Sequence, residues 1–399
     1  MPPIQSDGPW ARTLPAAMLL LAPFNILASL AMDIYLPAVP RMPAALGTTP
    51  AVVQLTLTVY LVVLGVGQLL FGPVSDRVGR RPVLFCGAFV FAAASFALAA
   101  TTSAVPFVCL RLVQAAGASA ALVALFATVR DVYAGDPRST VVYGLLNGML
   151  ACVPALGPLA GALVIAILDW QGVFLLLGAL AALSALYAEP RWRETRPPCR
   201  GLRGAGFGAM VRSPSFRTYT LGFSAAMGTF FVFFSTAPRV LIDGAGFAET
   251  GFSLAFSTVA LVMMATSWLA KHHIRRWGTA GSLARGMALL LAGAVALAAG
   301  QSWLAPSFWS FVAPMWIVAA GIALAASVTA NGALAGFDDI AGRAVALHFC
   351  LQSLVTGVVG TACVVLLDGA TAWPLVVFAS GMAVLTLALL RWNPLPDPS

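Results

Sequence analysis

The sequence predicts an all-α membrane protein with about twelve transmembrane helices in two pseudo-symmetric six-helix bundles. Of its 399 residues, 60% are hydrophobic and only 9% are charged, whereas soluble domains carry roughly 25% charged residues. Uncharged runs of about 20 residues, enough for a helix to cross roughly 30 Å of hydrocarbon, recur along the whole chain. Short motifs of the first half also return in the second half at an offset near 200 residues.

The membrane spans are expected to be helices, because backbone amides in lipid must be hydrogen-bonded within their own segment. The alternating pattern of barrel strands is not seen. The first six spans are expected near residues 14–36, 51–71, 83–101, 105–128, 141–166 and 171–188. The second six are expected near residues 216–236, 251–270, 284–302, 306–330, 343–367 and 372–391. The first span is too long, and too poor in cleavage-site signals, for a removable signal peptide.

A segment rich in Arg, Pro and Gly separates the two sets of spans and cannot itself cross a membrane. We therefore expect an N-terminal bundle at 1–190, a cytoplasmic linker at 191–215 and a C-terminal bundle at 216–399. Two pairs of motifs support related halves, since "MDIYLP" corresponds to "FFSTAP" and "SDRVGRR" to "IRRWG". Internal repeats with a binding site between the halves are typical of secondary transporters.

The cationic residues indicate how the chain is oriented. With the N-terminus inside, nearly all Arg and Lys residues fall in cytoplasmic loops, and the outer side keeps only Arg41 and Arg239. Both termini are therefore expected in the cytoplasm. The net charge of +8 is spread over these loops, so we expect no nucleic-acid partner, which would need a concentrated basic patch.

Several other activities lack the residues that they need. No Walker motif points to ATP as the energy source. The spans contain no nucleophile–base pair and no metal-ligand spacing, so we expect no enzyme activity, no metal site and no cofactor. The six cysteines fit small packing residues better than a disulfide framework. Nothing resembles a selectivity filter, which disfavours a channel.

The stretch "GPVSDRVGRRP" places one carboxylate and three guanidiniums between two uncharged runs. Its glycines would let two helices turn within a short loop, and its arginines could pair with Asp131 or with Asp338 and Asp339. Such ion pairs would hold the cytoplasmic helix ends together in one transport state; the alternative is that the cations only set topology. We call the predicted set the inner-gate cluster: Gly72, Asp76, Arg77, Gly79, Arg80, Arg81, Arg130 and Asp131.

Asp33 is the only one of the 14 acidic residues that falls inside a predicted span. A mid-span Asp costs about 2.5–3.5 kcal/mol on insertion scales, so one that persists usually has a partner or a task. Arg111 lies at a similar depth in the fourth span. We predict that Asp33 binds the coupling proton and that Arg111 adjusts its proton affinity. The alternative is a static ion pair near the outer interface.

Polar and aromatic helix faces predict a cavity for a flat, amphipathic molecule. Polar residues recur at i, i+4 and i+8 in the first and eleventh spans, and aromatic residues follow helical spacing in the seventh. His348 could titrate, although a lone buried histidine is more often a hydrogen-bonded core residue, and the aromatic stripe could equally be packing. The predicted cavity residues are Asn25, Ser29, Tyr60, Gln114, Asn147, Phe230, Phe231, Phe234, His348 and Gln352.

Three longer motifs are "GPVSDRVGRRPVL" (72–84), "RLVQAAGASA" (111–120) and "GMLACVPALGPLAGAL" (148–163). They resemble signatures of the major facilitator superfamily and of its twelve-span drug:proton antiporters, although Ala115 stands where that family usually has glycine. "SLAMDIYLPAVP", "FATVRDVYAG", "MGTFFVFFSTAPRVL", "SVTANGALAGFDDIAG" and "TAWP" resemble chloramphenicol and florfenicol exporters in particular.

The resemblance implies a proton-coupled efflux transporter that exports phenicol-type antibiotics by alternating access. It also implies the major facilitator fold and a location in the bacterial inner membrane as a functional monomer. It points to the same two residues, Asp33 and Arg111, for proton coupling. The alternatives are a proton-coupled exporter of other lipophilic drugs and an importer of a small metabolite.

Overall fold

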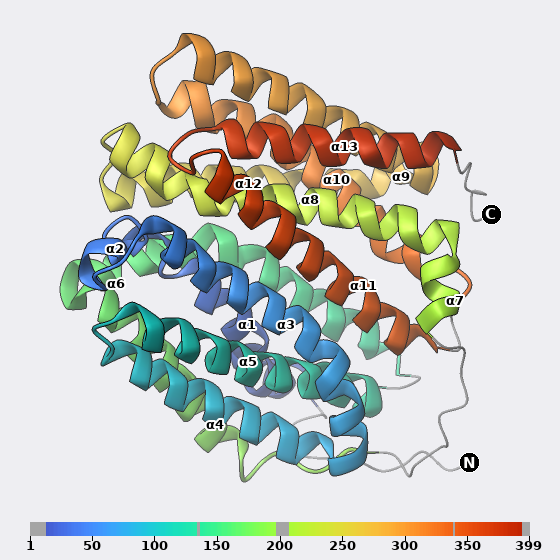
Figure 1. The fold of residues 1–399 in the computed structure, drawn as a ribbon. Coiled ribbons are helices and arrows are strands. Elements are labelled where there is room, and N and C mark those ends of the chain that lie inside the picture. The colour runs from blue at the N-terminus through green and yellow to red at the C-terminus, as the bar shows by residue number, and fades with distance from the viewer. Residues whose placement is uncertain (1–12, 134–135, 197–206, 338–339, 393–399) are drawn as a thin grey trace. The chain divides into compact units, whose positions relative to one another are not determined.

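The computed structural model describes residues 13–133, 136–196, 207–337 and 340–392 (Figure 1). Within these residues, eleven helices are long and apolar enough to cross a membrane. One of them, α6 (Arg138–Ala188), has 51 residues and contains both the fifth and the sixth predicted span. The prediction of an all-α membrane protein with twelve spans is therefore confirmed.

Some helices extend beyond the apolar runs from which they were predicted, as α3 (Pro50–Val78) does. The first half contains α1 (Leu14–Asp33), η2 (Leu36–Ala38), α2 (Met42–Ala45), α3 (Pro50–Val78), α4 (Arg80–Ala99), α5 (Ala104–Val132) and α6. The second half contains α7 (Phe207–Arg212), α8 (Pro214–Pro238), η3 (Arg239–Gly244), α9 (Glu249–Trp303), η4 (Phe308–Val312), α10 (Ala313–Leu334), α11 (Ala341–Val355), η6 (Thr356–Gly360), α12 (Thr361–Leu366) and α13 (Trp373–Trp392).

The predicted loop at 72–82 is wrong, because α3 continues to Val78 and α4 starts at Arg80. Gly79 alone is not helical, with a φ of 123° that favours glycine. Gly72 lies inside α3, where an added methyl group would meet nothing within 4 Å, so no turn requires it. The prediction failed because an uncharged run shows only which residues cross the hydrocarbon. A helix can continue beyond that region with charged residues.

The motif pairs of the two halves mark equivalent backbone features. Gly278, the counterpart of Gly79, interrupts α9 with a φ of 68° and so separates the eighth span from the ninth. Close helix contacts through glycine also recur. A methyl group on Gly87 of α4 would lie 2.7 Å from the carbonyl oxygen of Gly117 of α5. One on Gly286 of α9 would lie 2.9 Å from that of Gly321 of α10. Small residues allow such close approach of membrane helices.

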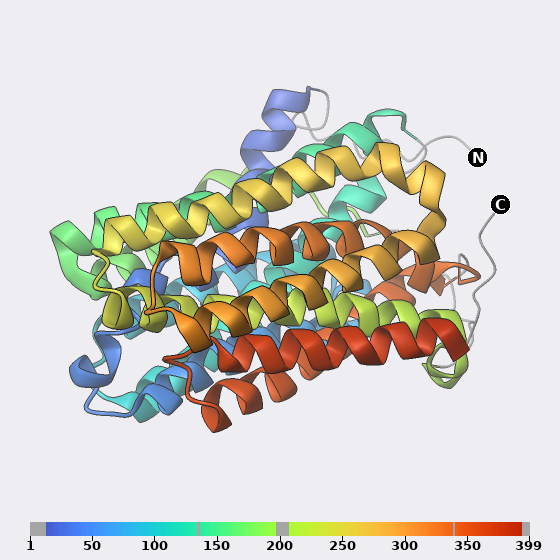
Figure 2. The ribbon, with the colours of Figure 1, turned by 90° about the horizontal axis from the view of Figure 1, so that it is seen from above.

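The chain divides into two compact units. Unit 1 comprises Met1–Tyr35, Ala45–Thr48 and Val59–Leu202, and unit 2 comprises Leu36–Ala44, Thr49–Thr58 and Arg203–Ser399. In unit 1, α5 packs against α4, and both α1 and α4 pack against α6. In unit 2, α10 packs against α8 and α9, and α13 packs against the same two helices (Figures 1 and 2).

Candidate functional site

Asp33 lies at the end of α1, where α6 comes unusually close. The side chain is only 5% exposed. A methyl group added to Gly157 of α6 would lie 2.8 Å from the Asp33 Cβ, and one added to Gly161 would collide with the carbonyl oxygen of Ile34. The glycines of the "PALGPLAG" segment therefore leave the space in which the end of α1, and with it Asp33, is buried.

Arg111 on α5 is fully buried in the same unit. Its Nη1 donates to the Gln114 Oε1 at 2.6 Å and to the carbonyl oxygen of Ala31 at 3.2 Å. The guanidinium carbon lies 4.7 Å and 4.4 Å from the ring centres of Tyr35 and Tyr60, distances typical of cation–π contacts. The Nε and Nη2 atoms have no hydrogen-bond partner among the described residues.

The structure contains no ion pair within 4.0 Å between Asp33 and Arg111, considering only the described part of the chain. Arg111 instead binds the Ala31 carbonyl, two residues before Asp33. The direct contact expected from the matching depths of the two residues is therefore not made in this state. The two tyrosine rings and the Ala31 carbonyl hold the guanidinium in its place.

Other predicted polar residues extend from Arg111 through unit 1. Gln114 donates from Nε2 to the Ser95 Oγ at 2.8 Å, and the Tyr60 hydroxyl donates to the Ala28 carbonyl at 2.9 Å. Asn25 donates to the carbonyl of Leu146 at 2.9 Å. The neighbouring Asn147 is exposed and Ser29 is half-buried. Ser95 is a member that the sequence analysis missed, because a lone serine in an apolar run carries no periodic signal.

In unit 2, the predicted polar residues of the eleventh span lie in the core. The His348 ring is 1% exposed, shares a 2.9 Å hydrogen bond between its Nδ1 and the Thr220 Oγ1, and stacks on Phe223 at 4.9 Å. Its Nε2 has no partner among the described residues. One turn further, Gln352 donates to the Thr356 Oγ1 at 3.1 Å.

The aromatic stripe of α8 divides between core and surface. Phe231 and Phe234 are buried, with 4% and 2% exposure, whereas Phe230 is half-buried. Phe230 and Phe234 both approach Phe256 of α9, with ring centres 6.1 Å and 6.4 Å apart. Much of the stripe therefore packs against α9, and Phe230 is its most accessible member.

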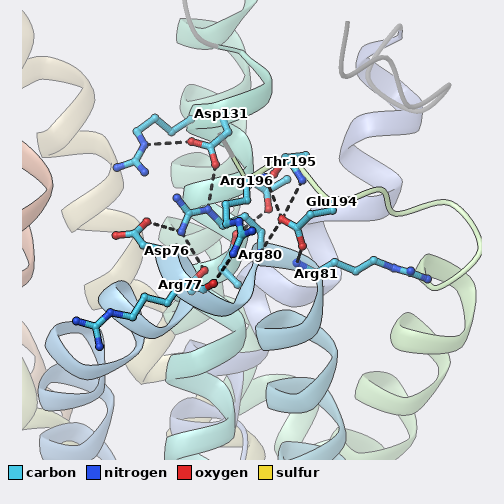
Figure 3. A network of polar contacts seen from close by, with 12 residues as sticks. Asp76, Arg77, Arg80, Arg81, Asp131, Glu194, Thr195 and Arg196 are labelled. Atoms are coloured by element: carbon cyan, nitrogen blue, oxygen red, sulfur yellow. Dashed lines mark hydrogen bonds and ion pairs between the residues drawn. The ribbon is translucent and has the colours of Figure 1, made fainter. Parts of the chain in front are cut away.

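The inner-gate cluster is built around Arg80 at the start of α4 (Figure 3). Although charged, its side chain is only 2% exposed. Its Nε lies 2.9 Å from the Asp131 Oδ2 of α5 and its Nη1 lies 2.6 Å from the Asp76 Oδ1 of α3. Arg130 lies 3.6 Å from the same Asp131 but is 58% exposed. Asp131 is thus the predicted partner that Arg80 contacts, whereas Asp338 and Asp339 lie outside the described residues.

The comparison with known proteins gives the family. Residues 21–361 match the model described as Major Facilitator Superfamily. The chain belongs to this superfamily. It is 50% identical over 381 residues to the chloramphenicol resistance protein of Pseudomonas aeruginosa, covering 95% of this chain and 91% of that one.

Two further similarities are to a multidrug resistance protein and to a solved transporter structure. The chain is 29% identical over 255 residues, or 63% of each chain, to the multidrug resistance protein MdtL of Klebsiella pneumoniae. A solved POT family transporter in complex with 5-aminolevulinic acid aligns with a TM-score of 0.76 over 94% of this chain and 95% of that one. Because its identity is 13%, this structure supports the fold alone.

The sequence analysis missed two carboxylates near the inner-gate cluster of this major facilitator protein. Glu189 pairs with Arg81 at 2.6 Å. Glu194 accepts hydrogen bonds from the backbone amides of Arg80 at 2.9 Å and Arg81 at 3.1 Å, at the start of α4 (Figure 3). It also accepts from its neighbours Thr195 at 3.0 Å and Arg196 at 2.9 Å. A helix N-terminus favours such an anion.

Two physical effects oppose each other at Glu194. Partial burial would raise the pKa of this carboxyl, but the four backbone hydrogen bonds outweigh it and hold the pKa below its usual range. A methyl group on Gly79 would lie 2.5 Å from the Glu194 Oε2. Glycine at 79 is therefore needed for the positive φ and also for this carboxylate. Nothing in the sequence pairs position 79 with a residue more than 100 positions away.

Unit 2 has polar contacts of its own near the C-terminal end of α8 and at the start of α9. Arg239 approaches Asp368 at 3.5 Å, and Arg41 pairs with Glu249 at 2.9 Å. Gln54 donates to the Ser235 Oγ at 3.0 Å. The two cations assigned to the outer side by the sequence, Arg41 and Arg239, thus each have an acidic partner.

Proposed function

We propose that this protein is a transporter rather than an enzyme and exports phenicol-type antibiotics in exchange for protons. The observation that carries the proposal is the burial, in one helical unit, of a carboxylate and a guanidinium with free hydrogen-bond donors. The substrate class follows from 50% identity over 95% of the chain to a chloramphenicol resistance protein. The proposed setting is the bacterial cytoplasmic membrane, with both termini in the cytoplasm and a functional monomer.

In the proposed cycle, Asp33 takes up a proton from one side of the membrane and releases it on the other. Ionisable residues inside membrane spans commonly form such proton relays. Arg111 is held within one turn of Asp33 by the Ala31 carbonyl, and its Nε and Nη2 donors have no partner among the described residues. The ionised Asp33 carboxylate can accept a hydrogen bond from a drug hydroxyl or bind a proton, so that proton and drug compete for one carboxylate. The Arg111 donors can bind an acceptor of the same drug.

Each unit by itself carries side chains that suit a phenicol, which has an aromatic ring and several polar groups. Unit 1 supplies the half-buried Ser29 and also Asn25, whose Oδ1 has no partner within the described ranges. Unit 2 supplies Phe230 for contact with the ring and the His348 Nε2 for hydrogen bonding. We propose these residues as the substrate contacts, together with Tyr60, Gln114, Asn147, Phe231, Phe234 and Gln352.

The inner-gate cluster is proposed to stabilise one end state of the cycle. The paired Arg80 joins α3, α4 and α5 at one end of unit 1. Ion pairs that form in one state and break in the other are a recognised way to make two arrangements discrete.

Drug transport in everted membrane vesicles tests the proposed coupling. Wild-type vesicles should accumulate chloramphenicol when a pH gradient is imposed and stop when an uncoupler is added. Asp33→Asn should abolish the response to the gradient. Asp136→Asn is the matched control, because Asp136 pairs with Arg138 two residues away, outside the long spans. Undiminished gradient-driven uptake by Asp33→Asn would remove Asp33 from the mechanism.

Susceptibility of cells that express the protein tests the substrate class. Chloramphenicol and florfenicol resistance that collapses with the proton gradient supports the phenicol exporter. The second candidate is a multidrug exporter, which the similarity to the multidrug resistance protein MdtL supports. Resistance confined to unrelated lipophilic drugs would favour this candidate. No resistance to any drug would contradict both.

A further inference from the structure

An open apolar groove runs along unit 1 between α3 and α4. It has a volume of about 390 Å³, within the range of ligand sites. Its floor is α5, which contributes only small residues, and its walls are apolar except for one thiol. The lining residues are Phe71, Val74, Val78, Pro82, Val83, Cys86, Gly87, Val90, Ala116, Gly117 and Ala120.

Glycine and serine contacts explain why the groove exists. Gly87 and Gly117 bring α4 and α5 so close that a methyl group on Gly117 would lie 2.6 Å from the Phe91 backbone nitrogen. On the other side, the Ser119 Oγ donates to the Leu64 carbonyl of α3 at 3.0 Å. The helix α5 therefore lies deep against both neighbours, and its small side chains leave the space above it empty. Because the side chains that border this space lack neighbours on one side, an occupant would supply the missing van der Waals attraction.

The groove is open on the surface of the unit rather than enclosed. Its wall residues Val74 and Val78 are 41% and 59% exposed, and Cys86 is also exposed. These residues belong to helices long and apolar enough to cross a membrane. An opening on the apolar face of membrane helices admits a hydrocarbon chain from the bilayer.

Cationic side chains lie beside the end of the groove that is formed by the junction of α3 and α4. Arg77, between the groove residues Val74 and Val78, is exposed, and its guanidinium has no partner among the described residues. In Figure 3 it extends away from the ion pairs of Arg80. The Arg196 guanidinium donates to the Arg77 carbonyl, which adds a second cation there. The nearby Asp76 carboxylate is already bound by Arg80.

We infer that this groove is a binding site for one anionic phospholipid, with an acyl chain between α3 and α4 and its phosphate at Arg77. The apolar lining selects the chain, and the unpaired guanidinium selects a negatively charged headgroup over a zwitterionic one. Basic residues at the ends of membrane helices bind anionic lipid in this way. The site lies on the two helices that meet at Gly79, so its occupant stabilises the helix ends that carry the inner-gate cluster. The inference does not depend on the transported substrate.

Native mass spectrometry of the full-length protein, released from detergent with defined lipids, tests the site. The probes are phosphatidylglycerol and phosphatidylcholine with identical chains at equal concentration. Wild type should retain one phosphatidylglycerol, at least about threefold more often than phosphatidylcholine. Arg77→Gln should bring that preference close to one, and Ala116→Phe, which fills the floor of the groove, should lower retention of both lipids. Leu163→Phe, on an exposed position of α6, should change neither.

Three results would overturn the inference. Equal retention of both lipids by wild type would mean ordinary lipid contact without headgroup selection. Unchanged retention by Ala116→Phe would place the lipid elsewhere on the surface. A preference that survives Arg77→Gln would remove the guanidinium from the site. Arg77→Gln changes an exposed side chain, so this arm remains informative even if Ala116→Phe does not fold.

Discussion

Asp131 pairs with two arginines, so one pair can serve as the control for a prediction about the other. Asp131 is 9% exposed and has two arginine neighbours. Arg80 approaches it at 2.9 Å and is 2% exposed, whereas Arg130 approaches it at 3.6 Å and is 58% exposed. Burial, rather than charge, distinguishes the two pairs. We therefore expect Arg80→Gln and Arg130→Gln to have very different effects.

The expected sizes follow from what each change leaves behind. Arg80→Gln removes the buried partner of Asp131 and leaves only the exposed Arg130 at 3.6 Å. Breaking a buried pair in this way typically costs about 3–5 kcal/mol of unfolding free energy. Arg130→Gln removes an exposed pair, for which about 0.2–1 kcal/mol is typical. Part of the Arg80 effect belongs to Asp76 and to the Ser75 Oγ, which accepts from Arg80 at 3.1 Å. A double-mutant cycle with Asp131→Asn isolates the Asp131 share, expected at about 2–3 kcal/mol.

The measurement is the unfolding free energy of the purified protein in detergent, followed by tryptophan fluorescence against denaturant. A second cycle combines Arg130→Gln with Asp131→Asn and gives the coupling of the exposed pair. Both cycles are repeated at high salt, which should weaken the coupling of the exposed pair while leaving that of the buried pair nearly unchanged. Equal coupling energies for Arg80 and Arg130 would refute the reasoning from burial. A buried-pair coupling that disappears in salt would refute it as well.

Three further predictions concern packing and protonation. Gly161→Ala should strongly lower the melting temperature, because its methyl group would collide with the Ile34 carbonyl. Gly148→Ala on the same helix is the control, since its methyl group would meet nothing within 4 Å. Equal melting temperatures of the two variants would contradict this. Glu194→Gln should destabilise the folded protein at neutral pH. Because folding lowers the pKa of Glu194, the difference in unfolding free energy between variant and wild type should shrink as the pH falls below 4.5. A difference that stays constant with pH would contradict this. Gly79→Ala should cost about 1–3 kcal/mol of unfolding free energy, because its φ of 123° and ψ of 158° lie in a region essentially restricted to glycine. Denaturant unfolding measures this cost, and a stability equal to that of wild type would contradict it.

The sequence predicted the helices well because their physical cause is local. Each span needs an uncharged run of sufficient length, and each run is contiguous in the chain. The motif pair at Gly79 and Gly278, used in the sequence analysis only as a sign of related halves, coincides in the structure with positive φ angles of 123° and 68°. The predicted loop at 72–82 failed for a related reason, because hydropathy reports where lipid ends and not where a helix ends.

Side-chain partners could be predicted only where few candidates existed. Asp131 was found as a partner of Arg80 because acidic residues are scarce and this one ends a span. Glu194 was not found, since it binds through backbone amides at a helix start, a contact that leaves no trace in composition. The expected Asp33–Arg111 pair was inferred from depth alone, and depth does not specify which way a guanidinium points around a helix.

The sequence alone therefore determined the all-helical membrane fold, the related halves and, among the residues that the structure describes, the acid that is buried in a span, because hydrophobic length and charge scarcity act residue by residue. Only the tertiary structure decided that Arg111 lies between two tyrosines, that Glu194 binds the start of α4 and that small residues of α5 leave a groove. These features depend on how closely helices approach, and that distance is set by residues far apart in the chain.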